Sequence, residues 1–80
     1  MATLGQERVG VTFNPSNDPR VDAFKEHTAY AIDELETLKG GATPEVARCA
    51  SIAQTKFEEA AMWAVKAITK PSSPVGSNDE

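Results

Sequence analysis

The chain has 80 residues, a formal net charge of −4 and an isoelectric point near 4.9. A chain of this length forms one domain and buries only about 60% of the surface that it exposes when unfolded, so its own core is marginal. The acidic balance argues against a protein that coats nucleic-acid polymers, because that function requires a dominant basic surface.

Targeting and redox signals are equally sparse. The single cysteine, Cys49, cannot form an internal disulfide, and no basic leader with an apolar run opens the sequence. No apolar stretch approaches the roughly 20 residues that a membrane helix needs. We therefore expect a soluble, reduced, cytosolic protein without a membrane partner.

Residues 1–18 carry the residues that interrupt regular structure. Gly5, Gly10 and Pro15 are followed by a run of asparagine, serine and aspartate. Residues 11–13, VTF, are the only piece with strand propensity. The sequence predicts an extended N-terminal arm and a turn over residues 1–18.

A helix is predicted over residues 19–39. Asp18 is suited to cap its first turn, and Pro19 suits the first helical position because its φ angle is already helical. Gly40-Gly41 ends it. The apolar and small residues recur at spacings of three and four, which places them on one stripe: Val21, Phe24, Thr28, Ala31, Leu35 and Leu38.

A second helix is predicted over residues 44–69, where Thr43 and Pro44 repeat the start signal. One seam at three-four spacing is rich in alanine: Val46, Ala50, Ala53, Phe57, Ala60, Ala64 and Ala67. Further apolar residues lie outside it: Cys49, Ile52, Trp63, Val65 and Ile68.

These patterns predict an all-α protein whose two long helices pair as an antiparallel hairpin over residues 19–70. Because one partner helix cannot cover all the apolar positions of the second helix, we expect several chains to assemble into a compact homo-oligomer. Residues 71–80 are rich in proline, serine and acidic residues without periodicity, which predicts a disordered tail.

Enzyme motifs are scarce in this sequence. One histidine and one cysteine cannot supply the usual ligand spacing of a zinc site, and no phosphate-binding loop is present. Cys49 lies among apolar residues, where a thiol is usually a small buried hydrophobe. We expect no metal, no cofactor and no catalytic residue, so the chain is predicted not to be an enzyme.

Residues suited to binding an anion gather at the start of the first long helix. In TFNPSNDPR, residues 12–20, Phe13 is suited to stack on a base, Asn14 to bond its edge, and Arg20 or Lys25 to neutralise phosphate. Alternatively, Phe13 anchors the arm and the asparagines only form turns. Composition alone favours this second interpretation.

Two further polar groups stand out on the helices. Lys25 and Thr28 are three residues apart and face the same way, with His27 adjacent. On the second helix, Arg48, Ser51 and Thr55 form a polar stripe. Either group is consistent with an anion site or with an ordinary wet surface.

Two blocks of sequence resemble a known family. FNPSNDPRVDAFKEHTA, residues 13–29, and AQTKFEEAAMWAVKAITK, residues 53–70, are similar to the phage-encoded anti-CBASS sponges, which share their helical hairpin with the Thoeris anti-defence sponges. The resemblance implies a helical hairpin that assembles into a hexamer in the cytoplasm of the infected bacterium. It also implies sequestration of cyclic di- and trinucleotide immune signals, such as cGAMP, without cleavage.

The resemblance also implies roles for individual residues. The cyclic dinucleotide would be held between two chains by stacking on an aromatic residue of the arm and by basic and hydroxyl groups of the first helix. By position, the ligand-binding residues are Phe13, Asn14, Pro15, Lys25, His27 and Thr28. A second, trinucleotide site falls on Arg48, Ser51 and Thr55, and the interface between chains on Ala53, Phe57, Ala60, Trp63 and Ala64.

Two alternatives to this function stay open. The chain is also consistent with an oligomeric helical hairpin whose arm binds another protein. A sponge for the ADP-ribose-derived signals of Thoeris is the other, although Thoeris-directed relatives carry an additional β-rich part for which 80 residues leave no room.

Overall fold

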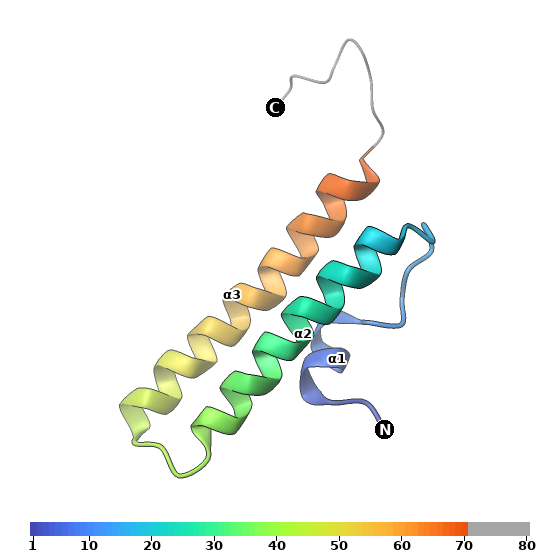
Figure 1. Cartoon of the computed structure of the whole chain (residues 1–80). Helices are drawn as coiled ribbons and strands as arrows, with labels where there is room; N and C mark the ends of the chain where they lie inside the picture. The colour runs from blue at the N-terminus through green and yellow to red at the C-terminus, as the bar shows by residue number, and fades with distance from the viewer. Residues whose placement is uncertain (71–80) are drawn as a thin grey trace.

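The computed structural model describes residues 1–70 and contains three helices: α1 (Leu4–Val9), α2 (Pro19–Lys39) and α3 (Pro44–Thr69). The two long helices form an antiparallel hairpin and α1 lies beside it (Figure 1). Within the described residues there is no strand, so the predicted all-α class is confirmed. None of these helices is long and apolar enough to cross a membrane. The predicted tail, residues 71–80, lies outside the described part of the chain.

Local capping bonds explain the bounds of the long helices, which are those expected from the sequence. The Asp18 carboxylate accepts a hydrogen bond from the Arg20 amide at 2.9 Å, and Pro19 follows as the first helical residue. The Thr43 hydroxyl oxygen accepts one from the Val46 amide at 3.3 Å. Each side chain satisfies an amide that the helix itself leaves unpaired.

The prediction of an extended arm over residues 1–18 is wrong for its first half, because α1 forms there. Thr3 and Gln6 make a reciprocal capping box, with bonds of 3.1 and 3.0 Å between side chains and amides. Gly10, with φ of 65°, ends the helix. Residues 11–13 continue as a turn instead of a strand, closed by a 2.9 Å bond from the Phe13 amide to the Gly10 carbonyl.

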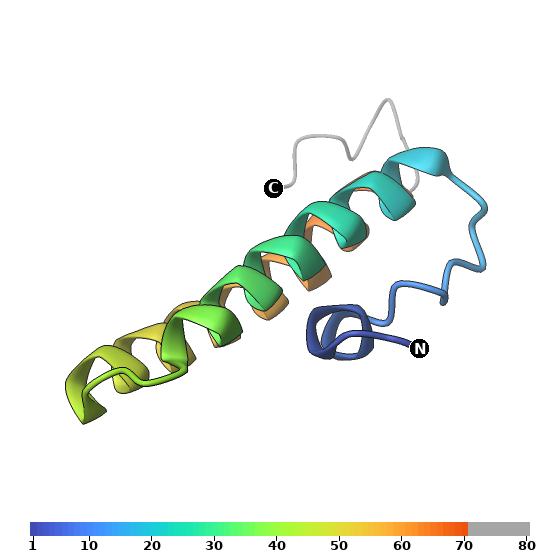
Figure 2. The same ribbon diagram turned by 60° about the horizontal axis from the view of Figure 1, so that its bottom comes forward.

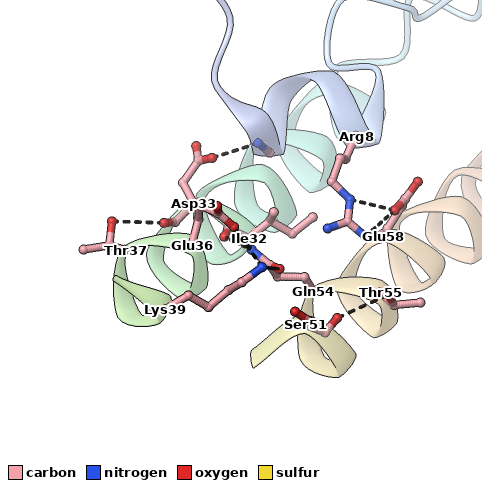
Figure 3. Close-up of polar contacts among 11 residues, drawn as sticks. Arg8, Ile32, Asp33, Glu36, Thr37, Lys39, Ser51, Gln54, Thr55 and Glu58 are labelled. Atoms are coloured by element: carbon pink, nitrogen blue, oxygen red, sulfur yellow. Dashed lines mark hydrogen bonds and ion pairs between the residues drawn. The ribbon is translucent and has the colours of Figure 1, made fainter. Parts of the chain in front are cut away.

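Three contacts fix α1 against the hairpin. Gly5 approaches α2 so closely that a Cβ atom there would lie 2.1 Å from the Ala29 carbonyl oxygen. The Gly5 amide donates to Asp33 at 2.7 Å, and the Arg8 guanidinium pairs with Glu58 of α3 at 2.8 Å (Figure 3). A helix of only six residues is unstable alone, so it depends on this docking.

The core of the hairpin is small and partly polar. The Cα atoms span 52 × 29 × 12 Å, and the short dimension is about one helix diameter. Among residues 1–70, the buried apolar residues are Val21, Ala29, Ile32, Ala50 and Ala61, and the buried polar ones are Lys25, Thr28 and Gln54. Because most of this apolar set is alanine, the hairpin buries little apolar side-chain area by itself.

Gln54 fixes how the two long helices pair. The residue is only 1% exposed. The amide nitrogen donates to the Ile32 carbonyl and to the Glu36 carboxylate, both at 3.0 Å, and the amide oxygen accepts from Lys39 at 3.2 Å (Figure 3). A one-turn slip of α3 would leave this buried amide unpaired, which is costly.

The predicted contact stripes are rotated relative to those observed. Phe24 and Leu38, expected on the stripe of α2, are exposed, whereas Lys25 is buried. On α3, Val65 is half-buried although it was placed outside the alanine seam, and Cys49 is exposed instead of buried. Three polar residues among residues 1–70, Lys25 and Thr28 on α2 and Gln54 on α3, are buried beside the apolar ones, because each has hydrogen-bond partners inside.

Apolar side chains consequently lie uncovered on the side of the hairpin away from α1. Leu35 is two residues from Asp33, and Ala60 two from Glu58, so each faces nearly opposite to the residue that holds α1. Figure 2 shows α1 on one side of the paired long helices only. We call the uncovered side the free apolar face; its larger members are Phe24, Leu35, Leu38, Val46 and Phe57.

Substitution of Gly5 tests the docking of α1. We expect Gly5→Ala to lower the free energy of unfolding by about 1–3 kcal/mol, because the new methyl group overlaps the Ala29 carbonyl. Urea denaturation at a fixed protein concentration measures this change. Gly40→Ala is the matched control, since a Cβ there meets only Thr37 at 3.4 Å and should change stability by less than about 1 kcal/mol. Equal losses in both variants would contradict the docking.

Candidate ligand-binding site

The segment between α1 and α2 folds as a tight turn held by Asn14. Its amide nitrogen donates to the Asp18 carbonyl and to the Asp22 carboxylate, each at 3.0 Å, while its oxygen accepts from the Asn17 amide at 3.1 Å. The Ser16 hydroxyl donates to the same oxygen at 2.6 Å. The Asn14 side chain is thus engaged in the turn, as the second interpretation of this segment predicted.

Phe13, by contrast, presents its ring to solvent. The residue is 69% exposed, so it does not anchor the segment in a core. The Lys25 ammonium lies 5.5 Å from the ring centroid, within the range of a cation–π contact. One aromatic surface is therefore available for stacking, next to a positive charge.

Lys25 and Thr28 face the same way on α2, as their spacing predicts, but that side is buried and both are bonded within the chain. The Lys25 ammonium donates to the Gly10 carbonyl at 2.9 Å and to the Phe13 carbonyl. The Thr28 hydroxyl lies 2.9 Å from the Phe24 carbonyl and 3.1 Å from that of Lys25. Neither side chain extends freely toward solvent.

His27 does not join this group. It is exposed, and its ring contacts Phe24 edge to face with centroids 6.5 Å apart. Successive helical residues diverge by about 100°, which directs His27 away from the side that Lys25 and Thr28 share. Its aromatic neighbour is therefore Phe24, a member of the free apolar face.

A hollow of about 220 Å³ joins the predicted residues of the turn to the end of α3. It is lined by Phe13, Asn14, Pro15, Ser16, Val21, Lys25, Val65 and Thr69. Val65 and Thr69 were not predicted as site residues, although the expected antiparallel pairing brings the end of α3 to the start of α2. A second hollow of about 260 Å³ shares Lys25 and Val65 and continues beneath α1, with Arg8, Val9, Glu58, Ala61 and Met62.

The Acb2/Tad1 hairpin-domain family model matches residues 5–69, which include α1, the turn and both long helices. The chain belongs to this family. The family is that of the anti-CBASS and anti-Thoeris sponges, phage anti-defence proteins for cyclic nucleotide signals, so the resemblance seen in the sequence is confirmed. No curated protein and no solved structure matches the chain.

The residues predicted for a second sponge site lie apart from the hollow, in the first half of α3. Arg48, Ser51 and Thr55 are all exposed. Arg48 pairs with Glu45 at 2.8 Å, and this bond lowers the pKa of the Glu45 carboxyl below its usual value. The Thr55 hydroxyl donates to the Ser51 carbonyl at 3.2 Å. A trinucleotide site there stays a prediction that this chain alone does not test.

The predicted interface residues provide exposed apolar surface on α3. Trp63 is 62% exposed and Phe57 39% exposed, while Ala60 is exposed and Ala53 and Ala64 are half-buried. The Lys66 ammonium lies over the Trp63 ring, 4.9 Å from the ring centroid. These residues are accessible to another chain, although the oligomeric state itself is not tested by a single chain.

Charged groups at the turn are paired with each other. Asp18 and Arg20 form an ion pair at 2.8 Å, and the hydrogen bonds from Arg20 lower the pKa of the Asp18 carboxyl from 3.8 to about 2. Within residues 1–70, no three acidic, histidine or cysteine side chains gather closely enough to hold a metal ion. The charge available at the hollow is that of Lys25.

Titration of Asp18 tests the capping of α2. Because its folded pKa lies below its unfolded value, the capping contribution is complete above about pH 4 and is lost as pH falls toward 2. We expect the Asp18 carboxyl carbon, followed by NMR, to titrate with a midpoint near 2. In Arg20→Gln, which removes the largest cause, the midpoint should move toward 3.8. A midpoint near 3.8 in the unaltered chain would contradict the ion pair.

Proposed function

We propose that this chain is a phage anti-defence sponge that binds cyclic di- or trinucleotide signals of CBASS and sequesters them without cleavage. The match to the Acb2/Tad1 hairpin domain carries this proposal, because it covers residues 5–69 and so includes the whole candidate site. The sponge acts in the cytoplasm of the infected bacterium, where such signals are made.

The geometry of Phe13 supports a ligand that contains bases. Stacking of a base on an aromatic side chain contributes about 1–3 kcal/mol and tolerates any base, because every base has a π face. The exposed Phe13 ring offers such a surface, and the Lys25 ammonium places positive charge beside it. A ligand with both bases and phosphates is complementary to this pair.

One chain provides only part of the site. The hollow at the turn measures about 220 Å³, below the roughly 300–1,000 Å³ of pockets that enclose a drug-sized ligand. The ring of Phe13 lies at its edge and faces solvent. We infer that a second copy supplies the opposite wall, so that the ligand lies between two chains.

The free apolar face supports the assembly that this sharing requires. A hairpin about 12 Å thick cannot cover apolar side chains on both of its sides. Phe24, Leu38 and Phe57 would be excluded from water by other copies, and the proposed assembly is the hexamer implied by the family resemblance.

Sequestration sets a requirement on affinity instead of on catalysis. A sponge must compete with the defence effector, which calls for binding in roughly the nanomolar range, or about −12 kcal/mol. Stacking from two copies of Phe13, together with hydrogen bonds from the wall that the second copy supplies, brings this within reach. No group has to stabilise a transition state.

Calorimetric titration with a panel of cyclic dinucleotides, cyclic trinucleotides and cyclic ADP-ribose derivatives tests the proposal. We expect nanomolar binding of at least one CBASS-type member, and chromatography after heat release should recover that ligand intact. Phe13→Ala should weaken dinucleotide binding by at least about tenfold, which matches the loss of one stacking contact or more. Tyr30→Ala, an exposed aromatic outside both the hollow and the free apolar face, is the control for ligand contact.

Other outcomes of this titration separate the alternatives. A chemically altered ligand would show an enzyme, and binding of the ADP-ribose derivatives alone would assign the chain to the Thoeris branch. If no member of the panel binds, the interaction-module interpretation gains support instead. If Phe13→Ala changes the mass of the assembly, Phe13 is a packing residue.

Substitution at the free apolar face tests the assembly separately. Phe57→Glu places a charge among apolar side chains, so we expect the oligomer to dissociate, as measured by sedimentation or light scattering. Lys56→Glu introduces the same group at an exposed neighbouring position and should leave the mass unchanged. A monomeric unaltered chain at working concentration would contradict the proposed hexamer.

A further inference from the structure

Lys25 is a buried lysine that bonds to the backbone of one loop. The residue is 6% exposed, and within residues 1–70 no carboxylate forms an ion pair with it. A buried ammonium is costly unless its N–H groups find acceptors. Here the acceptors are the carbonyls of Gly10 and Phe13, the two ends of the turn between α1 and the candidate site.

These bonds clamp the residues that carry the Phe13 ring. The Gly10 carbonyl already accepts from the Phe13 amide at 2.9 Å, which closes the turn, and the left-handed backbone of Gly10, with φ of 65° and ψ of 53°, sets the direction of that carbonyl. The Lys25 ammonium donates a hydrogen bond to each of the two carbonyls, and its charge strengthens both bonds. The Phe13 ring itself has little packing to hold it, because it is 69% exposed.

We propose that Lys25 is a positioning residue for the sponge site: it orders residues 10–13 so that Phe13 is presented for stacking before ligand arrives. This inference rests on the proposed function and assigns Lys25 a task other than direct phosphate contact. Without the clamp, ligand binding must also order the turn, and that ordering reduces affinity. The ammonium acts through the loop, and Phe13 contacts the ligand.

Hydrogen exchange of the ligand-free protein tests the clamp directly. In Lys25→Met, which keeps the length of the side chain but removes its donors, we expect the Phe13 and Val11 amides to exchange at least about tenfold faster. Amides in the middle of α2 and α3 should be unchanged. Lys56→Met, at an exposed lysine, is the matched control and should leave the turn unaffected. Unchanged exchange at Phe13 in Lys25→Met would overturn the proposal.

A comparison of charged and uncharged ligands separates positioning from phosphate contact. The probes are the cyclic dinucleotide that binds best and the phosphate-free nucleosides adenosine and guanosine, titrated by NMR at millimolar concentration. Positioning predicts that Lys25→Met weakens nucleoside binding as well as dinucleotide binding, with the larger factor for the dinucleotide because it stacks on two copies of the ring. Weakening confined to the dinucleotide would assign Lys25 to the phosphate and overturn the proposal.

Gly10→Ala provides a second variant that keeps the ammonium, and it decides the question if Lys25→Met fails to fold. A residue with a Cβ is strained at φ of 65°, so this substitution loosens the turn from the other side. We expect faster exchange at Phe13 and weaker ligand binding although Lys25 is intact. Full affinity with a loosened turn would contradict positioning.

Failure of the sponge proposal would be recognised separately from failure of the positioning proposal. If the sponge proposal fails, the unaltered chain binds no probe. The hydrogen-exchange result needs no ligand and still tests the clamp.

Discussion

The structure depends on a polar contact line between two helices that have little apolar surface to share. Gln54 is buried between α2 and α3, and each polar atom of its amide has a partner. Such a network is favourable only when it is complete, because each unpaired group would carry the full cost of its lost hydration. It therefore specifies one pairing of the hairpin more strongly than alanine packing does.

This polar line accounts for the placement of the apolar residues. With Lys25, Thr28 and Gln54 inside, Phe24 and Phe57 lie on the outside of the hairpin. The distribution is the reverse of that in an isolated globular domain, where large apolar side chains fill the interior. It suits the proposed assembly, in which the main core would form between chains and the hairpin would need only enough internal contact to define its shape.

Helix bounds could be predicted from the sequence because they are local. Asp18-Pro19 and Thr43-Pro44 satisfy amides within a few residues, whatever the rest of the chain does. The short α1 also has a local signal, the pairing of Thr3 with Gln6, but its docking needs the close approach of Gly5 to Ala29. That contact joins positions 24 residues apart along the chain, and periodicity carries no information about it.

The orientation of the long helices was less predictable for a related reason. Spacings of three and four define a stripe but do not say which of two stripes faces the partner. Hydropathy predicts that the apolar stripe faces the partner helix. This prediction is reliable only where the polar side chains would find no hydrogen-bond partners inside. Lys25 has such partners because the turn after α1 brings two carbonyls over it, and that turn was expected to be extended.

The contacts of the candidate site also depend on the folded turn. Phe13 could be identified as an available aromatic residue, but the hydrogen bonds of Asn14 and Lys25 within the chain follow from the folded turn. Asn14 and Lys25, which the sequence suggests as ligand contacts, thus form hydrogen bonds to the backbone of their own chain. If the proposed ligand joins two such sites on different chains, its binding stabilises the assembly by mass action, and the assembly in turn supplies the wall that one hairpin lacks. Ligand capture and core formation are then a single linked equilibrium.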